Sequence, residues 1–228
     1  LGFGETTVIT GYTHETIDGA WAFLREHGAR IADSEIPAAK DSFDPYRESD
    51  PHAVSVLQVA LEMLDTNAIL DPPDEEIRVP ILAPVNSKDH GEIPDEIEAL
   101  LEQGFGTLKV KIGWNVDHDL ERLRLIQRTN AGRATLRLDA NQGFTREQAL
   151  RFAGALDTDS VQLFEQPCDA NDWDSNAAVA AASPVPVMMD ESIYGFRDIE
   201  RAGTMKGCGF VKLKISKSTG VDLLTEGL

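Results

Sequence analysis

The spacing of apolar residues changes character near residue 75. Before it, apolar positions recur at helical intervals over residues 15–30 and 51–70, and both stretches are predicted to be helices. The polar residues 41–50 between them predict a loop. Residues 71–76 (DPPDEE) break all periodicity and predict a boundary between two domains.

After residue 77, short apolar runs alternate with amphipathic stretches, which predicts alternating strands and helices. The expected strands are residues 79–85, 108–112, 135–138, 161–164, 185–189 and 210–215. The expected helices are residues 92–103, 116–128, 146–156, 172–182 and 196–202. This alternation is typical of βαβ units with a parallel sheet, either doubly wound or closed into a barrel. The dinucleotide-binding pattern GxGxxG is absent, because Thr7 stands where its third glycine would be, and the Walker and GxSxG patterns are absent too.

The charge of the chain excludes several classes of partner. It has 21 Lys and Arg against 39 Asp and Glu, a net charge of −18, which disfavours nucleic acid and anionic membranes as partners. No run reaches the roughly 18 apolar residues of a membrane span, and residues 1–5 (LGFGE) lack the basic and then apolar pattern of a signal peptide. The two cysteines, Cys168 and Cys208, form no CxxC pair, so a reducing, cytoplasmic setting is expected.

Charged residues follow five successive predicted strands at regular intervals. They are Lys109 with Lys111, Asp139, Glu165, Asp190, and Lys212 with Lys214. The intervals from Lys111 to Asp139 and onward to Lys214 are 28, 26, 25 and 24 residues, about one βα unit each. An isolated residue of this kind is more often a helix cap or a solvated edge residue. The regular series is better explained by a barrel, in which the carboxyl ends of the strands converge on one face.

The residue types in this series indicate chemistry on a carboxylate substrate. Three carboxylates on neighbouring strands form an oxygen site that suits magnesium, with manganese as a substitute. In each lysine pair the residues are two apart and so share one face of their strand. An ammonium crowded by another loses its proton more readily, and the resulting amine serves as a base. Such bases on the second and sixth strands would approach a substrate from opposite sides, while the metal stabilises the enediolate that forms when the α-proton leaves.

In order, spacing and residue type, these motifs resemble the enolase superfamily, in particular its muconate-lactonizing-enzyme subgroup (the mandelate racemase/muconate lactonizing enzyme family). The similarity covers residues 2–220, nearly the whole chain. It implies three magnesium ligands, which are Asp139, Glu165 and Asp190. It also implies supporting positions around them, which are Asn141, Glu191 and Lys212.

The same resemblance implies the bases. Lys111 is expected to be the base at the end of the second strand, with Lys109 as its electrostatic helper, and Lys214 the opposing base on the sixth strand. A sixth-strand lysine favours this subgroup, because the mandelate racemase subgroup uses a His–Asp pair with its histidine on the seventh strand. None of the five histidines lies in such a position.

The resemblance further implies two domains. Residues 1–75 are expected to be most of an α+β capping domain that lacks its first strands, and residues 76–228 a TIM-like (β/α) barrel domain of α/β class. Residues 10–15 (TGYTHE) resemble the loop that closes over the substrate, and Tyr12 is either a substrate contact or a buried structural aromatic. From residue 79 to 228 there are 150 residues, which at ~25 per unit supply about six βα units rather than eight. The last strands are therefore expected to be missing.

The function implied by this resemblance is the magnesium-dependent removal of an α-proton from a small carboxylate substrate through an enediolate. An isomerase is expected, either a racemase/epimerase or a cycloisomerase. One alternative is a lyase, such as a dehydratase or an o-succinylbenzoate-synthase-like enzyme. Another is an inactive fragment or metal-binding pseudoenzyme, which the short barrel motivates. A homo-oligomer is expected from the resemblance, and neither nucleic acid nor membrane is expected as a partner.

Overall fold

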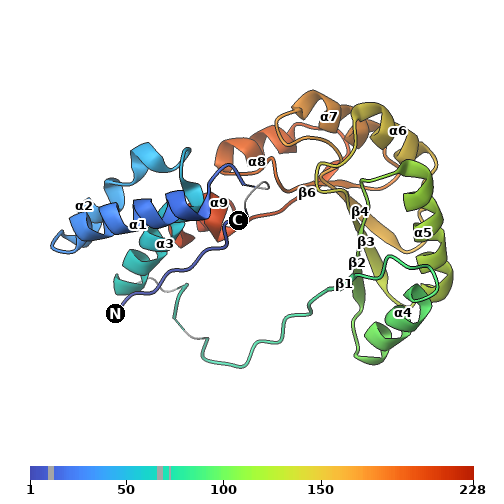
Figure 1. Cartoon of the computed structure of the whole chain (residues 1–228), viewed down its shortest axis with the longest axis horizontal. Helices are drawn as coiled ribbons and strands as arrows, with labels where there is room; N and C mark the ends of the chain where they lie inside the picture. The colour runs from blue at the N-terminus through green and yellow to red at the C-terminus, as the bar shows by residue number, and fades with distance from the viewer. Residues whose placement is uncertain (10–12, 66–68, 72) are drawn as a thin grey trace. The chain divides into compact units, whose positions relative to one another are not determined.

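The structure is a computed structural model that describes residues 1–9, 13–65, 69–71 and 73–228. Its contacts group the chain into two units (Figure 1). The first unit is Leu1–Glu76 with Tyr194–Arg197 and Leu213–Leu228, and the second is Ile77–Ile193 with Asp198–Lys212. The domain boundary expected at residue 75 stays a prediction, and these contacts group the last sixteen residues with the N-terminal unit.

The first unit is built from helices in the part of it that the structure describes. They are α1 (Ile17–Ile31), α2 (Ile36–Asp41), a 3-10 turn η1 (Asp44–Tyr46), α3 (Pro51–Leu64), α9 (Ile215–Ser218) and α10 (Val221–Glu226). The two predicted helices are present, and α3 ends six residues earlier than expected. Residues 41–50, expected to be a loop, contain η1, which begins at a proline-containing turn. The core of the unit joins α1 to α3 through Phe23, Phe43 and Val54.

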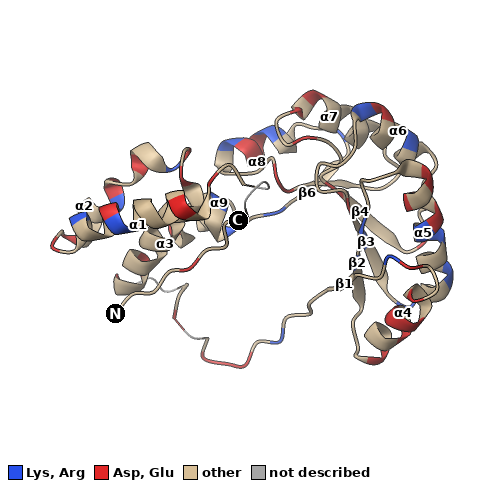
Figure 2. Cartoon of the chain, in the orientation of Figure 1, with Lys and Arg blue, Asp and Glu red and all other residues tan. Residues whose placement is uncertain are grey.

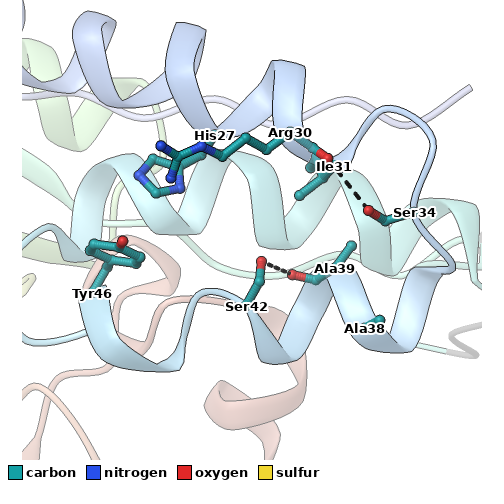
Figure 3. A pocket seen from close by; sticks show the side chains of 8 residues that line it. All are labelled: His27, Arg30, Ile31, Ser34, Ala38, Ala39, Ser42 and Tyr46. Carbon is teal, nitrogen blue, oxygen red and sulfur yellow. Dashed lines mark hydrogen bonds between the residues drawn. The ribbon is translucent and has the colours of Figure 1, made fainter.

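A small cavity of about 150 Å³ lies between α1 and α2 (Figure 3). The two serine hydroxyls in its lining bond to the helix backbone, because Ser42 Oγ donates to Ala39 O at 2.6 Å and Ser34 Oγ to Arg30 O at 3.4 Å. His27 stacks on Phe23 with ring centroids 4.0 Å apart. The cavity is therefore a gap in the packing of the two helices.

The N-terminus of α3 is capped from another part of the chain. Asp50, its N-cap residue, makes no side-chain cap hydrogen bond. Instead, the buried Glu15 carboxylate accepts hydrogen bonds from the backbone amides of His52 and Ala53 at 2.8 and 2.9 Å, and from His52 Nδ1 at 2.6 Å. Burial opposes ionisation of Glu15, but these hydrogen bonds outweigh it and lower its pKa.

Glu15→Gln is expected to lower the free energy of unfolding by about 1–3 kcal/mol, because a charged acceptor of buried amides is lost. The folded-state pKa of Glu15 is lowered, so its stabilisation is complete above the unfolded value of 4.5 and is lost as the pH falls through the folded-state pKa. Urea unfolding of both proteins at neutral and acidic pH checks this. The difference between them should shrink in acid. Glu26→Gln, an exposed carboxylate on α1, is the control and should change stability by less than about 0.5 kcal/mol. A difference that is constant with pH would contradict the role of the charge.

The second unit holds a six-stranded parallel sheet in the order β1-β2-β3-β4-β5-β6. The strands are β1 (Ala83–Val85), β2 (Thr107–Lys111), β3 (Thr135–Asp139), β4 (Val161–Glu165), β5 (Val187–Met189) and β6 (Cys208–Val211). The helices between them are α4 (Ile93–Glu102), α5 (Val116–Asn130), α6 (Arg146–Gly154), α7 (Trp173–Ala182) and α8 (Phe196–Gly203). Helices α4 to α7 lie along the outer face of the sheet (Figure 1). This is the expected alternation of six strands with helices, as in an incomplete (β/α) barrel.

Three strands are shorter than the sequence predicts, and one of them is β5, which begins at Val187 rather than at residue 185. Residues 79–85 were expected to be one strand, but only Ala83–Val85 pairs with β2. Because β2 begins at Thr107, it has almost no residues that could pair with the chain before Ala83. Ile77, Val79 and Ile81 accordingly remain about 70% exposed. Residues 210–215 were also expected to be a strand, but β6 ends at Val211 and α9 begins at Ile215.

Charge is distributed over the surface of the second unit rather than gathered in one basic region. Acidic and basic residues both occur along the outer helices α5 and α6, whereas the charged residues of α4 and α7 are all acidic (Figure 2). Within the described residues, none of the helices combines the length and the apolar character needed to span a membrane.

Candidate active site

The register of the sheet brings the charged strand ends together. Lys111 at the end of β2 is paired with Asp139 at the end of β3, and Asp139 is paired with Glu165 at the end of β4. Glu165 is paired with Met188, two residues before Asp190. Because all the strands are parallel, these residues lie at one edge of the sheet, as the sequence predicts.

Asp139 is the centre of the first part of this cluster. Its Oδ2 atom lies 2.6 Å from Lys109 Nζ and 2.6 Å from Lys111 Nζ. The side chain of Asn141 joins the same group, because its Oδ1 accepts a hydrogen bond from Lys111 Nζ and its Nδ2 donates one to Glu191 Oε1 at 2.8 Å. Lys111 is therefore held by a carboxylate and an amide oxygen from the next strand end.

Glu165 is the centre of the second part. Its carboxylate lies 2.9 Å from Lys109 Nζ and 2.9 Å from Lys212 Nζ. Lys212 Nζ also lies 3.4 Å from Asp190 Oδ2. The ammonium groups of Lys109 and Lys212 thus link the ends of β3, β4 and β5 into one continuous network of ion pairs.

The network combines buried carboxylates with lysine ammonium groups. The carboxylates are those of Asp139, Glu165, Asp190 and Glu191, and Lys109, Lys111 and Lys212 place ammonium groups beside them. All four acidic residues are no more than 4% exposed. Buried carboxylates are costly unless cations lie beside them, so this group of acidic side chains is a place where positive charge is stabilised.

The shifts in pKa follow from burial and from the ion pairs. Burial opposes ionisation of Asp139, but the ammonium groups of Lys109 and Lys111 outweigh it and lower its pKa. Burial and the neighbouring charge of Asp139 together raise the pKa of Glu165, despite its two lysine partners. Burial works against the charged form of Lys212, but its hydrogen bond to Glu165 prevails and raises its pKa. Lys212 is therefore held as a cation by its partners.

The donor set fits a hard divalent cation. The acidic residues that follow β3, β4 and β5 offer carboxylate oxygens, which magnesium prefers to nitrogen or sulfur. Among the residues with described positions, no three acidic, histidine or cysteine side chains already have the spacing of a metal site. The carboxylates are instead bridged by lysine ammonium groups, because like charges at this separation must be balanced by some cation. The assignment of Asp139, Glu165 and Asp190 as metal ligands stays a prediction.

Lys214 and Tyr12 are the two remaining residues that the sequence predicts for the site. Lys214 belongs to the first unit, where it is the N-cap residue of α9 with an extended backbone. Lys212 and Lys214 do not share a strand, contrary to the pattern read from the sequence, because β6 ends at Val211. The role of Lys214 as a second base stays a prediction. Tyr12 lies outside the residues that the structure describes.

Gln166 is a supporting residue that the sequence pattern did not identify. It is fully buried and has a positive φ of 35°. Its Oε1 accepts hydrogen bonds from the amides of Asp190 and Ser192 at 2.9 and 3.2 Å, and its Nε2 donates to Ser192 Oγ at 2.8 Å. Gln166 thus fixes the backbone at Asp190. Its position directly after Glu165 was the available signal.

Replacing Gln166 by leucine, which has a similar volume, is expected to lower the free energy of unfolding by about 1–3 kcal/mol for each buried amide left without an acceptor. Urea unfolding measures this loss. The matched control is Gln162→Leu on β4, the strand that Gln166 follows, where the side chain is exposed and accepts a hydrogen bond from Arg137 Nε. Its effect should stay within about 0.5 kcal/mol. Equal effects of the two substitutions would show that Gln166 does not fix this turn.

Comparison with known proteins gives a family match over most of the second half of the chain. A family model described as Enolase C-terminal domain-like matches residues 92–225. The D-Ala-D/L-Ala epimerase of Cytophaga hutchinsonii is 35% identical over 120 residues, which are 53% of this chain and 33% of that protein. The L-Ala-D/L-Glu epimerase of Clostridium acetobutylicum is 26% identical, over 97% of this chain and 65% of that protein.

Solved structures agree with these sequence matches. A dipeptide epimerase from Cytophaga hutchinsonii, in complex with Mg and the dipeptide D-Ala-L-Val, superposes with a TM-score of 0.88 at 25% identity, over 98% of this chain and 63% of that one. Muconate cycloisomerase from Pseudomonas fluorescens gives a TM-score of 0.83 at 25% identity, over 99% of this chain and 66% of that one. This chain therefore spans less than two thirds of the length of each of these relatives.

Proposed function

This chain belongs to the Enolase C-terminal domain-like family of the enolase superfamily, and on that basis we propose that it is an isomerase that epimerises or racemises a carboxylate substrate. The observation that supports this most directly is the network of lysines and carboxylates at the strand ends. It places a lysine beside buried carboxylates, which is what α-proton removal from a carboxylate requires. The relatives with epimerase names support an epimerase over a cycloisomerase.

The residues of the network have separate tasks in this proposal. Lys111, in its neutral form, takes the α-proton from one face of the substrate, and Lys214 returns a proton from the other face. Lys109 stays charged between Asp139 and Glu165, where its ion pairs at 2.6 and 2.9 Å hold both carboxylates in place. Magnesium, bound by Asp139, Glu165 and Asp190, would supply positive charge that stabilises the negative charge developing on the substrate carboxylate.

Lys111 is better suited than Lys109 to meet a substrate. The Lys111 side chain is 40% exposed, whereas that of Lys109 is 11% exposed and touches two carboxylates. A base must lie within hydrogen-bonding reach of the proton that it removes. Lys111 is therefore proposed as the base and Lys109 as a charge that stabilises the network.

The proposed substrate class is a small dipeptide. The epimerase relatives carry dipeptide names, and one related structure holds the dipeptide D-Ala-L-Val. A second candidate, cycloisomerisation of a muconate, is motivated by the structural likeness to muconate cycloisomerase. The two differ in what they form, because an epimerase inverts a stereocentre and a cycloisomerase closes a lactone ring.

Proton NMR in D₂O tests the proposal. The protein is incubated with magnesium and, in separate samples, with L-Ala-L-Glu, L-Ala-D-Glu, other dipeptides and cis,cis-muconate. Loss of a dipeptide α-proton signal, with signals of the other diastereomer appearing, is expected. Lactone signals from muconate alone would support the cycloisomerase, and loss of water from a substrate would support a lyase. No exchange with any substrate, from folded protein that binds magnesium, would contradict the proposed function.

A further inference from the structure

The segment that follows Lys214 is fastened to α3 by a buried carboxylate. Glu62 on α3 is fully buried. Its Oε2 accepts a hydrogen bond from the amide of Val221 at 2.7 Å, and its Oε1 accepts one from the amide of Asp222 at 3.3 Å. Gly220 makes this approach feasible, because a Cβ atom there would lie 2.5 Å from Glu62 Oε1. Glu62 therefore holds the beginning of α10 close against α3.

The guanidinium group of Arg47 binds the same segment at Thr219, two residues before Val221. Arg47 Nη1 donates to Thr219 Oγ1 at 2.6 Å and to Thr219 O at 3.4 Å. Arg47 is itself held by Asp44, whose Oδ1 accepts from Arg47 Nε at 2.8 Å. Thr219 is buried and has a left-handed backbone with φ 60°. This conformation costs free energy in a residue other than glycine, and the two hydrogen bonds from Arg47 help to maintain it.

The backbone between Lys214 and these two anchoring contacts is short and closed by hydrogen bonds. The carbonyl oxygen of Lys214 accepts hydrogen bonds from the amides of Lys217 and Ser218 at 3.0 and 2.9 Å, which close the single turn of α9. Lys217 and Ser218 are both buried. The backbone of Lys214 is thus joined through one closed turn to Thr219, which Arg47 holds. Its position on the first unit follows from contacts made by α3 and by the loop before α3.

We propose that Glu62 and Arg47 are positioning residues for Lys214, so that the N-terminal unit decides where the second base stands. The inference rests on the proposed function, in which Lys214 acts on one face of the substrate. Without the two anchors, the backbone after α9 would be held less firmly, and the position of the Lys214 ammonium group would be less sharply defined. Misplacement of a reacting group by about 1 Å can lower a rate by on the order of 10²-fold.

A purely structural role would lower α-proton exchange from both stereoisomers alike, whereas a positioning role lowers exchange from one of them. The experiment measures α-proton exchange in D₂O from each stereoisomer of a dipeptide substrate, using the whole chain with magnesium. Glu62→Gln is expected to lower exchange from the isomer that depends on Lys214 by about 10- to 100-fold. Exchange from the isomer that depends on Lys111 should change by less than about threefold.

Two further variants complete this test. Arg47→Lys keeps the positive charge at a partly exposed position, but an ammonium group cannot donate to Asp44 and Thr219 with the geometry of a guanidinium. If Glu62→Gln fails to fold, this variant should show the same loss of exchange from one isomer only. Glu48→Gln, an exposed neighbour of Arg47, is the control and should leave both rates unchanged. Equal losses for both isomers in the folded variants, or no loss in either, would overturn the positioning role.

Lys214→Ala separates failure of this inference from failure of the proposed function. It should abolish exchange from one isomer only. If Lys214→Ala is one-sided and the Glu62 and Arg47 variants are not, the positioning role is wrong and the base assignment stands. If Lys214→Ala affects both isomers equally or neither, or if the unaltered protein catalyses no exchange, the base assignment fails and the positioning role falls with it.

Discussion

Replacing Lys111 by alanine is expected to lower α-proton exchange from one stereoisomer of the substrate by on the order of 10²–10⁴-fold, the usual contribution of a general base. Lys111 is the more exposed of the two lysines that contact Asp139. Its removal leaves Lys109 in place between Asp139 and Glu165, so the network should keep two of its three ammonium groups. Exchange measured by proton NMR in D₂O reports the loss directly.

Lys111→Arg distinguishes a base from a fixed positive charge. A guanidinium retains the charge and can still pair with Asp139, but it does not lose its proton near neutral pH. This variant is therefore expected to be as slow as Lys111→Ala. Activity close to that of the unaltered protein would show that position 111 contributes charge rather than proton transfer. Circular dichroism of both variants checks that the fold is retained.

Glu165→Gln is expected to abolish stabilisation by magnesium and, with it, most of the activity. A ligand that binds only the folded protein stabilises it by about 2.7 kcal/mol at a concentration 100 times its Kd, and an amide replaces a charged oxygen ligand poorly. The variant should still fold, because Lys109 keeps its ion pair with Asp139 and Lys212 keeps its ion pair with Asp190. Thermal unfolding with and without magnesium measures the effect, and electron paramagnetic resonance of added Mn²⁺ measures binding itself.

Glu147→Gln is the matched control for this substitution. Glu147 lies in the first turn of α6 and is exposed, so its neutralisation changes the net charge by the same amount without removing one of the buried carboxylates. Magnesium should stabilise this variant as much as the unaltered protein. Equal binding of Mn²⁺ by the Glu165 and Glu147 variants would show that Glu165 is not a ligand.

The alternation of elements and the identity of the clustered residues could be predicted from the sequence. Strands such as β2 and β3 are buried in a parallel sheet, so their sequences are short apolar runs. Helices such as α5 have one apolar face, which gives a helical spacing of apolar residues. Parallel strands end at one edge of their sheet, so charged residues placed one βα unit apart must meet there. The sequence therefore predicted that Lys111, Asp139 and Glu165 lie close together in one site.

The pairing within that site could not be predicted in the same way. Which ammonium contacts which carboxylate depends on the register of β2, β3 and β4 and on the side-chain conformations at their ends. Gln166 was missed because its importance comes from the amides of Asp190 and Ser192, which are about 25 residues away in the sequence. Hydrogen bonds of this kind leave no periodic signal in the chain.

The sequence by itself determined the α/β class, the order of six strands and the residues that gather at their carboxyl ends, because each of these depends on local periodicity and on chain direction. Only the tertiary structure decided where β6 ends and that Lys214 belongs to the N-terminal unit. The segment after Lys214 is joined to residues more than 150 positions earlier, because Arg47 donates a hydrogen bond to Thr219 and Glu62 accepts one from the amide of Val221. Such contacts exist only once the chain has folded, since nothing in the local pattern around residue 214 specifies its distant partners.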